Sequence, residues 1–451
     1  MDFNRTMSVA AAAIVAGSAA ARADDLTLCW AAWDPANALV ELSKDFEALT
    51  GHKMSFEFVP WPNFADRMLN ELNSGGELCD LMIGDSQWIG LGAEAGHYIK
   101  LNDFFEAEGI SMDDFLPATV TGYAEWPKGT PNYWALPAYA DVVGWTYRKD
   151  WFDKPELQAE FKEKYGRALE APKTLDELME VAKFFQKREI DGKTVYGAAI
   201  YTERGSEGIT MGVTNALYNY GFSYGTPEEP YKLDGVVNSP EAAKGLEYYK
   251  ELYDCCTPPG SSDWYMSEDI DAYKSGQVAL QMNFAFIWPG VEADPNVGGG
   301  KSGYFANPAG PDGHFAQLGG QGISVVSYSD SQDAALEYIK WFAQPEIQQK
   351  WWDMGGASAM RAVVEAPDFA SSQPFEVEAP DFASSQPFAQ TFLDSMAIVK
   401  DFWAEPSYAS LLLSMQDRVH KYVVAGEGTA QEALDALVKD WTEVFEDDGK
   451  I

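Results

Sequence analysis

The chain has 451 residues, 46% of them hydrophobic and 14% aromatic, so it can bury sizeable cores, and two domains are the natural expectation. Its 70 acidic and 32 basic residues give a net charge of −38. Such a surface repels nucleic acids and anionic membranes and favours a soluble monomer. The four histidines are far apart, and there is no P-loop and no GxGxxG before a helix. We therefore expect no cofactor, no zinc site and no histidine-based catalytic site.

The N-terminus predicts export. A positive residue, Arg5, precedes an apolar, alanine-rich run over 7–21, and Ala21-Arg22-Ala23 is typical of a signal-peptidase site. The run is too short for a membrane span, and no cysteine stands at the cleavage point. We expect a cleavable signal peptide over about residues 1–23 and a periplasmic mature protein without a lipid anchor.

The first part of the mature chain alternates strands and helices. Apolar or alternating segments predict strands at 26–31, 54–59 and 81–83, and helical spacing predicts helices over 35–50 and 64–72. The order β-α-β-α-β indicates a parallel sheet covered by helices.

Polar and aromatic residues follow two of these strands. They are Trp33, Asp34, Asp85, Gln87 and Trp88. Ligands of open α/β sheets bind beyond the carboxyl ends of strands, which makes these residues site candidates. The aspartates can equally cap the helices that follow, whereas capping does not account for the tryptophans.

Residues 134–152, WALPAYADVVGWTYRKDWF, predict a strand that leaves one compact unit and enters another. Asp141 is the one charged residue between Trp134 and Tyr147. It is either a buried turn or capping residue or a ligand-binding carboxylate at a hinge, because an unpaired buried charge is costly.

The rest of the chain is rich in helices, with strands at 196–200 and 278–282. Export permits disulfides. Cys29 and Cys79 fall on strands of the same unit, so their pairing is plausible. For the adjacent Cys255 and Cys256, two free or differently paired thiols are the default expectation, because vicinal disulfides are rare.

Several motifs occur in a familiar order, among them CDLMIGDSQW (79–88), the stretch at 134–152, YKSGQVALQMNFAFIWPG (273–290) and GGQGISVVSYSDSQDAALEYIKWF (319–342). In this order the chain resembles the carbohydrate-type, maltose-binding-protein-like solute-binding proteins of bacterial ABC importers. The resemblance implies a binding protein, not an enzyme. Such a protein captures a sugar, oligosaccharide or glycoside by hinge closure and delivers it to the permease subunits of the importer.

The resemblance also implies a fold and domain boundaries. The fold class is α/β, with two lobes that are each a mainly parallel sheet flanked by helices, and with the ligand cleft between them. Lobe 1 would comprise residues 24–139 and 320–360, and lobe 2 residues 140–319 and 361–451. The chain would cross between lobes near Tyr139–Asp141, near Gly319–Gln321 and after Arg361.

A sugar site needs polar groups for the hydroxyls and aromatic faces for the C–H surfaces. The candidates after the first unit are Tyr139, Asp141, Trp264, Asn283, Trp288, Gly320, Gln321 and Arg361. By resemblance, the positions that face the ligand are Asp85, Asp141, Trp264, Trp288, Gly320 and Arg361. For Trp264 the alternative is core packing, for Trp288 a strand-end turn, and for Arg361 a structural salt bridge.

Two further points stay open at this level. The segment 364–375, VEAPDFASSQPF, recurs identically at 377–388, and such a local duplication is expected in a surface loop. The ligand can also be another small polar or cationic solute. An exported glycosidase with two carboxylates is a more distant alternative, because the resemblance is to binding proteins. The spacing of such a carboxylate pair cannot be read from sequence.

Overall fold

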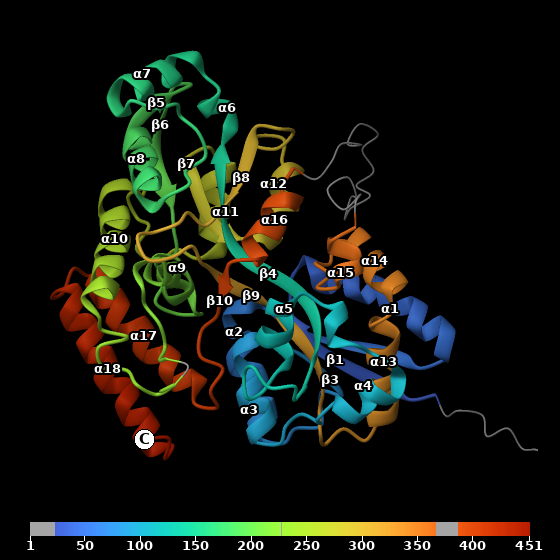
Figure 1. Ribbon diagram of the computed structural model, residues 1–451. Helices are drawn as coiled ribbons and strands as arrows, with labels where there is room; N and C mark the ends of the chain where they lie inside the picture. The colour runs from blue at the N-terminus through green and yellow to red at the C-terminus, as the bar shows by residue number, and fades with distance from the viewer. Residues whose placement is uncertain (1–22, 227, 367–386) are drawn as a thin grey trace, which may run out of the picture.

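Two lobes joined by strands make up the computed structural model, which describes residues 23–226, 228–366 and 387–451 (Figure 1). The predicted signal peptide, except its last residue, and most of the tandem repeat lie outside these residues. In the described part of the chain, none of the helices is both long and apolar enough to cross a membrane.

The first lobe contains the predicted β-α-β-α-β unit. Strands β1 (Asp25–Ala31), β2 (Lys53–Val59) and β3 (Leu81–Asp85) are parallel, with β1 in the middle. Helix α1 (Asp34–Thr50) buries Leu39, Leu42 and Phe46. Helix α2 (Trp61–Asn73) buries Phe64, Met68 and Leu72 at helical spacing. The apolar stripes of both helices therefore cover the sheet.

Strand β4 (Leu136–Arg148) runs from one lobe into the other. Residues 136–142 pair with β9 (Ala316–Val325), whereas residues 143–147 pair with β7 (Val278–Phe284). The partner changes between Val142 and Val143, one residue beyond Asp141, so this carboxylate lies where the strand passes between the lobes. Strand β9 in turn pairs with β3, which makes the two sheets continuous through β4 and β9.

The second lobe has a mixed sheet. Strands β6 (Lys193–Ala199) and β7 are parallel, while β5 (Arg188–Ile190) pairs antiparallel with β6. Strand β8 (Ser302–Ala306) lies antiparallel to β4. The short β10 (Val399–Lys400) pairs with the first residues of β9 and brings the C-terminal segment to the junction of the lobes.

The remaining helices flank these sheets and the connections between them (Figure 1). They are α3 (Ile89–Glu94), α4 (Asn102–Glu108), α5 (Pro117–Thr119), α6 (Lys149–Phe152), α7 (Pro155–Tyr165), α8 (Leu175–Phe185), α9 (Gly208–Leu217), α10 (Pro240–Cys256), α11 (Met266–Lys274), α12 (Trp288–Glu292), α13 (Gln332–Phe342), α14 (Pro345–Asp353), α15 (Arg361–Val364), α16 (Ala389–Met396), α17 (Tyr408–Val423) and α18 (Ala430–Asp447). Single-turn helices are η1 (Ser86–Trp88), η2 (Met112–Asp114), η3 (Val120–Ala124), η4 (Tyr218–Tyr220) and η5 (Ala285–Ile287).

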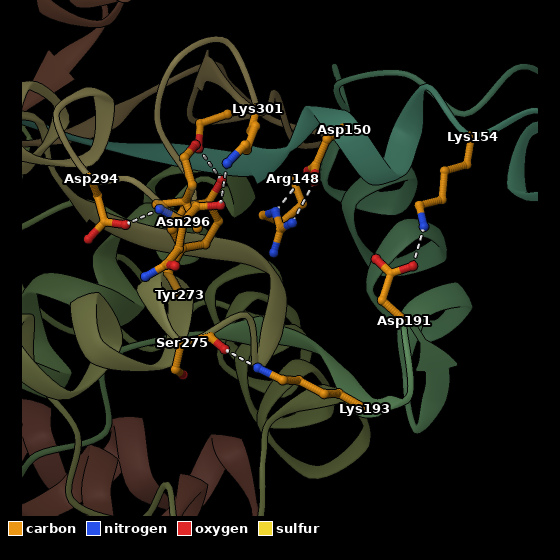
Figure 2. A network of polar contacts seen from close by, with 12 residues as sticks. Arg148, Asp150, Lys154, Asp191, Lys193, Tyr273, Ser275, Asp294, Asn296 and Lys301 are labelled. Carbon is orange, nitrogen blue, oxygen red and sulfur yellow. Dashed lines mark hydrogen bonds and ion pairs between the residues drawn. The ribbon is translucent and has the colours of Figure 1, made fainter.

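Charged side chains pair at and just beyond the far end of β4 in the second lobe (Figure 2). Arg148 donates from Nε and Nη2 to the two carboxylate oxygens of Asp150, at 2.8 and 2.5 Å. Nearby, Lys154 Nζ lies 2.7 Å from Asp191 Oδ1. A bidentate arginine pair fixes the orientation of both side chains, so it orders the turn from β4 into α6.

Both cysteine pairs form disulfides. Cys29 on β1 and Cys79 just before β3 are bonded with their Cα atoms 5.7 Å apart, which confirms the plausible pairing. Cys255 and Cys256 at the end of α10 are also bonded to each other. The expectation of free or differently paired thiols was therefore wrong, since the turn at the helix end brings the adjacent sulfur atoms together.

Candidate functional site

A narrow cavity lies between the lobes where β4 and β9 run side by side, and we call it the central cavity. Its volume is about 20 Å³, which holds about one water molecule. It is lined by Trp33, Trp61, Asp85, Gln87, Asp141, Glu207, Met211, Met266, Phe284, Phe286, Leu318, Gly319, Gly320 and Gln321. A sugar ring does not fit in this volume, so its walls must separate to admit one.

Two larger hollows adjoin the central cavity. One, of about 310 Å³, shares Asp141 and Phe286 with it. The other, of about 320 Å³, shares Trp61, Asp85 and Glu207. The three spaces follow one another along the junction of the lobes, so a ligand longer than one ring has room to extend on either side once the walls part.

Asp141 is 3% exposed and lies in the wall of the cavity. Its Oδ1 accepts hydrogen bonds from the backbone N–H groups of Val142 at 2.8 Å and Phe286 at 3.2 Å. Val142 is the next residue of β4 and Phe286 lies on η5, so the carboxylate ties this point of the strand to the turn that follows β7. Burial raises the pKa of Asp141 to about 8, although the backbone donors oppose the shift.

Asp85 and Glu207 face the same cavity from different lobes. Asp85 ends β3, and its Oδ1 accepts from the Ser86 N–H at 2.9 Å. Glu207 precedes α9 with a left-handed backbone (φ 73°), and its Oε1 accepts from the Tyr408 hydroxyl. Burial, and then the charge of Glu207, raises the pKa of Asp85 well above its usual value. Burial also raises the pKa of Glu207 to about 7.

A fourth buried carboxylate, Asp401, supports the wall from behind. Its Oδ1 accepts from Gln87 Nε2 at 2.9 Å and from Gln317 Nε2 at 3.1 Å. Burial raises the pKa of Asp401, and the charge of Lys128 partly opposes that shift. The same burial lowers the pKa of Lys128 to about 8. Asp401 does not line the central cavity, so its role there is to orient Gln87.

Aromatic rings form the remaining wall. The ring of Trp33 lies 5.0 Å from that of Tyr139, 5.3 Å from Phe286 and 5.9 Å from Trp61, measured between centroids. Trp33, Trp61 and Phe286 all border the central cavity. Such faces suit the C–H surface of a sugar ring or a cationic group.

Gly320 allows β4 and β9 to approach each other at this point. Its φ of +91° is in the left-handed region, and a Cβ there would lie 2.2 Å from the Tyr139 carbonyl oxygen and 2.4 Å from the Tyr123 hydroxyl. No larger residue fits without moving backbone.

The structure places the sequence candidates in four groups. Six line the central cavity: Trp33, Asp85, Gln87, Asp141, Gly320 and Gln321. Asp34, Tyr139 and Trp288 line the hollow of about 310 Å³, and Trp88 lines the one of about 320 Å³. Trp264 and Asn283 line none of these spaces, and Arg361 lies elsewhere.

Asn283 and Trp264 have structural contacts. Asn283 accepts from the Tyr201 hydroxyl at 2.7 Å and donates to the Met266 carbonyl at 3.1 Å, which leaves it 1% exposed. The backbone N–H of Trp264 donates to Thr202 Oγ1 at 2.9 Å. These bonds fix the loop before α11 behind the cavity wall.

Arg361 is not brought to the cleft. It begins α15, and its Nε donates to Glu365 Oε1 at 3.0 Å one helical turn along. It borders a separate surface hollow together with Asp113 and Asp114. The alternative of a structural salt bridge therefore describes this residue in the structure.

Some cavity residues were not predicted from sequence. Trp61 follows β2, and Glu207 lies in the loop after β6. Both residues come after a strand, so the rule that ligands bind beyond strand ends, which selects Trp33 and Asp85, also applies to these two positions. Met211, Met266 and Phe284 carried no separate signal, because apolar residues at such positions are typical of core. Among the described residues, no group of three or more histidine, cysteine, aspartate or glutamate side chains is placed to hold a metal ion.

Comparison with known proteins identifies the family. The sequence profile of the bacterial extracellular solute-binding proteins matches residues 32–349. The chain belongs to this family. The resemblance of its motifs is thereby confirmed, and the family and fold are those of binding proteins found outside the cytoplasm.

Individual relatives are distant. A Deinococcus radiodurans protein named as a probable ABC transporter-binding protein is 24% identical over 343 residues, covering 74% of this chain and 76% of that protein. The diacetylchitobiose binding protein DasA of Streptomyces coelicolor is 25% identical over 316 residues, covering 66% of this chain and 64% of that protein.

Solved structures share the fold. Maltose-bound MalE3 of T. maritima superposes with a TM-score of 0.76 at 21% identity, covering 94% of this chain and all of that one. A ribitol complex of a solute-binding protein from Agrobacterium radiobacter K84 has a TM-score of 0.74 at 22% identity, covering 93% of this chain and 98% of that one. The α/β, two-lobed binding-protein fold is thus confirmed.

Proposed function

We propose that this protein is the periplasmic substrate-binding component of an ABC importer for a sugar, oligosaccharide or glycoside. The observation that carries the proposal is the central cavity, whose polar and aromatic walls come from both lobes at the strands that join them. A ligand bound there contacts both lobes at once, so binding stabilises the closed form that the permease would receive.

The carbohydrate part of the proposal rests on two supports. The aromatic faces of Trp33, Trp61 and Phe286 stand beside carboxylate and amide groups, which is the combination that a sugar requires. The Streptomyces coelicolor relative is named as a diacetylchitobiose binding protein, and the solved neighbours include complexes with maltose, ribitol and cycloalternan.

The lobe boundaries, the signal peptide over residues 1–23 and the permease partner belong to the same proposal. The change of β4 from β9 to β7 after Val142 supports a crossing near Tyr139–Asp141. Helix α15 packs against α14 of the first lobe, which supports a third crossing beyond Val364, a few residues later than the expected boundary at Arg361.

The test is a ligand screen on the purified mature protein. Ligands that bind only the native state raise its melting temperature, by an amount that grows with concentration over Kd. We expect at least one mono- or oligosaccharide to raise the melting temperature and to reduce the radius of gyration in solution scattering, as the lobes close. No response to any carbohydrate, together with a response to an amino acid or a polyamine, would reject the carbohydrate proposal.

A second candidate, an exported glycosidase, has a specific observation behind it, since several carboxylates with raised pKa surround the cavity. Incubation with aryl glycosides and product analysis distinguishes it. Stoichiometric binding without product release supports the binding protein, and multiple turnover supports the enzyme.

A further inference from the structure

We infer that the bound carbohydrate carries a positively charged amino group, which lies between Asp85 and Glu207 beside Asp141, so that the ligand is an amino sugar or a related polyhydroxylated amine. This inference rests on the proposed function and specifies the chemical class of the ligand at the same site.

The first observation is that the carboxylates of the central cavity have no cationic partner. None of the ion pairs formed by the described residues includes Asp85, Asp141 or Glu207. The neighbouring half-buried cation, Lys128, donates to the Gly122 carbonyl oxygen at 2.6 Å and does not line the cavity. Buried carboxylates are ordinarily paired, because removing their charge from water is costly. A cationic ligand supplies the missing partner.

The second observation is an unpartnered acceptor in the same wall. Gln87 is 2% exposed, and its Nε2 is committed to Asp401, which can only accept while ionised. This contact fixes the orientation of the amide, and Gln87 Oε1 is left without a hydrogen-bond partner. The wall therefore presents a neutral acceptor next to carboxylates, which an N–H donor of the ligand satisfies.

The balance of donors and acceptors favours an ammonium group over a hydroxyl. An ammonium group donates three hydrogen bonds and accepts none, whereas a hydroxyl donates only one. The acceptors at this end of the cavity are the carboxylates of Asp85, Asp141 and Glu207 and the amide oxygen of Gln87. Trp33, which also lines the cavity, has an unpartnered Nε1 that is a donor for a ring hydroxyl. The cavity thus suits a ligand with both kinds of group.

The aromatic residues fit the same ligand. Trp33 and Trp61, whose ring centroids are 5.9 Å apart, lie in the cavity wall with Asp85 and Glu207. A cation near an aromatic face is attracted by the ring, and a sugar ring stacks on it. Neither aromatic contact alone selects a cation. Together with the unpaired carboxylates, the two rings form a site in which a ligand amine is neutralised and a sugar ring is stacked.

Proton linkage gives a property that separates a cationic from a neutral ligand. The ionisable groups that interact electrostatically with the Asp85 carboxylate are Glu207, Asp401, Asp141, Tyr265 and Tyr408. Lys128 interacts in turn with Asp401. In the free protein, burial and the neighbouring charges of Glu207 and Asp401 raise the pKa of Asp85. Burial and the charge of Asp401 bring the pKa of Glu207 to about 7, so Glu207 holds part of a proton near neutral pH. A cation displaces those protons, and its affinity rises with pH until its own amine deprotonates.

The experiment compares sugars that differ only at one substituent. The probes are glucosamine and its β-1,4 disaccharide, the N-acetylated counterparts of both, and glucose and cellobiose. Melting temperature and calorimetric affinity are measured with the mature protein. We expect the amines to bind at least about tenfold more tightly than their N-acetyl and hydroxyl analogues. We also expect proton release on binding, detected as a heat that depends on the ionisation enthalpy of the buffer.

Charge-removing variants locate the amine. Glu207→Gln and Asp85→Asn keep side-chain size, and each should lower affinity for the amine about tenfold or more while leaving affinity for the N-acetyl analogue within about threefold. The matched control is Asp269→Asn. Asp269 is fully buried without a hydrogen-bond partner but does not line the cavity, so this variant should keep the preference for the amine.

The outcomes separate this inference from the proposed function. Equal or tighter binding of neutral analogues would overturn the cationic ligand and leave carbohydrate binding intact. Binding of spermidine with no response to any sugar would overturn both. If Glu207→Gln fails to fold, the buffer dependence of the heat in the unaltered protein decides. More protons released by the amine than by its N-acetyl analogue supports the inference, and equal release overturns it.

Discussion

Gln87 and Asp401, 314 positions apart in the chain, are joined by a hydrogen bond of 2.9 Å from the amide nitrogen to the carboxylate. Gln87 follows β3 of the first lobe, and Asp401 follows β10, whose partner is β9. The bond ties the C-terminal segment to the cavity wall and decides which end of the Gln87 amide faces the ligand.

The first prediction concerns this bond. Gln87→Leu leaves the buried Asp401 with fewer donors, and we expect the free energy of unfolding to fall by about 1–3 kcal/mol. Urea unfolding followed by fluorescence measures it. Gln349→Leu is the control, because Gln349 makes a similar bond to Asp353 on the surface and should change stability by less than about 0.5 kcal/mol. Equal effects of the two variants would contradict the role given to Gln87.

The second prediction concerns Asp141 in ligand binding. Asp141→Ala removes a carboxylate from the wall and leaves the Val142 and Phe286 N–H groups without their acceptor. We expect affinity for the ligand found in the screen to fall about 10- to 100-fold, measured by calorimetry. Unchanged affinity in a folded variant would remove Asp141 from the site.

The third prediction is a pH dependence of stability. The pKa of Asp141 is about 8 in the folded protein and that of Glu207 about 7, both above the values of unfolded chains. The folded state therefore holds protons that the unfolded state has lost, and stability falls as pH rises from about 5 to about 8. Melting curves without ligand should show this decline.

Asp141→Asn tests the origin of that decline. The amide cannot ionise, so the variant should lose up to about 1.4 kcal/mol per pH unit of the dependence between about pH 5 and about pH 8. The surface variant Asp353→Asn should keep the dependence of the unaltered protein. A decline of the same slope in Asp141→Asn would show that other groups cause it.

The fourth prediction compares the two disulfides. The Cys29–Cys79 bond closes a loop with a sequence separation of 50, for which chain entropy gives a stabilisation of about 4 kcal/mol. The Cys255–Cys256 bond joins neighbours and closes no such loop. We expect Cys29→Ser/Cys79→Ser to lower the free energy of unfolding substantially and Cys255→Ser/Cys256→Ser to lower it by much less. Denaturant unfolding of the two double variants measures both.

The fifth prediction concerns the glycine at the strand crossing. Gly320→Ala places a Cβ 2.2 Å from a backbone oxygen of β4, so the strands must separate and the site must deform. Gly75→Ala is the control, because Gly75 also has a positive φ (+63°) but an open surrounding space. We expect a cost of about 1 kcal/mol for Gly75→Ala from backbone strain and clearly more for Gly320→Ala, with loss of ligand binding only in the latter. If Gly320→Ala and Gly75→Ala had similar effects on stability and binding, the close approach of the added Cβ to the Tyr139 carbonyl oxygen would not be what requires glycine at position 320.

Much of the protein was determined by local sequence pattern. The alternation of apolar strands and amphipathic helices in the first unit, the crossing strand around Asp141 and the strand-end residues Trp33, Asp85 and Gln87 could all be read from the chain, because hydrophobic period and the geometry of parallel sheets are local rules.

The tertiary structure decided which of these groups meet. Glu207 precedes α9 and Trp61 begins α2, yet both join Asp85, the last residue of β3, in one cavity. Arg361 pairs with Glu365 and not with the cleft. The pairing of β4 with β9 and then β7 sets those positions, and it depends on contacts between segments more than a hundred residues apart. Which carboxylates belong to the site also depended on the tertiary structure. The chain has 70 acidic residues, and burial between the two lobes is what distinguishes the few carboxylates of the site from those on the solvated surface.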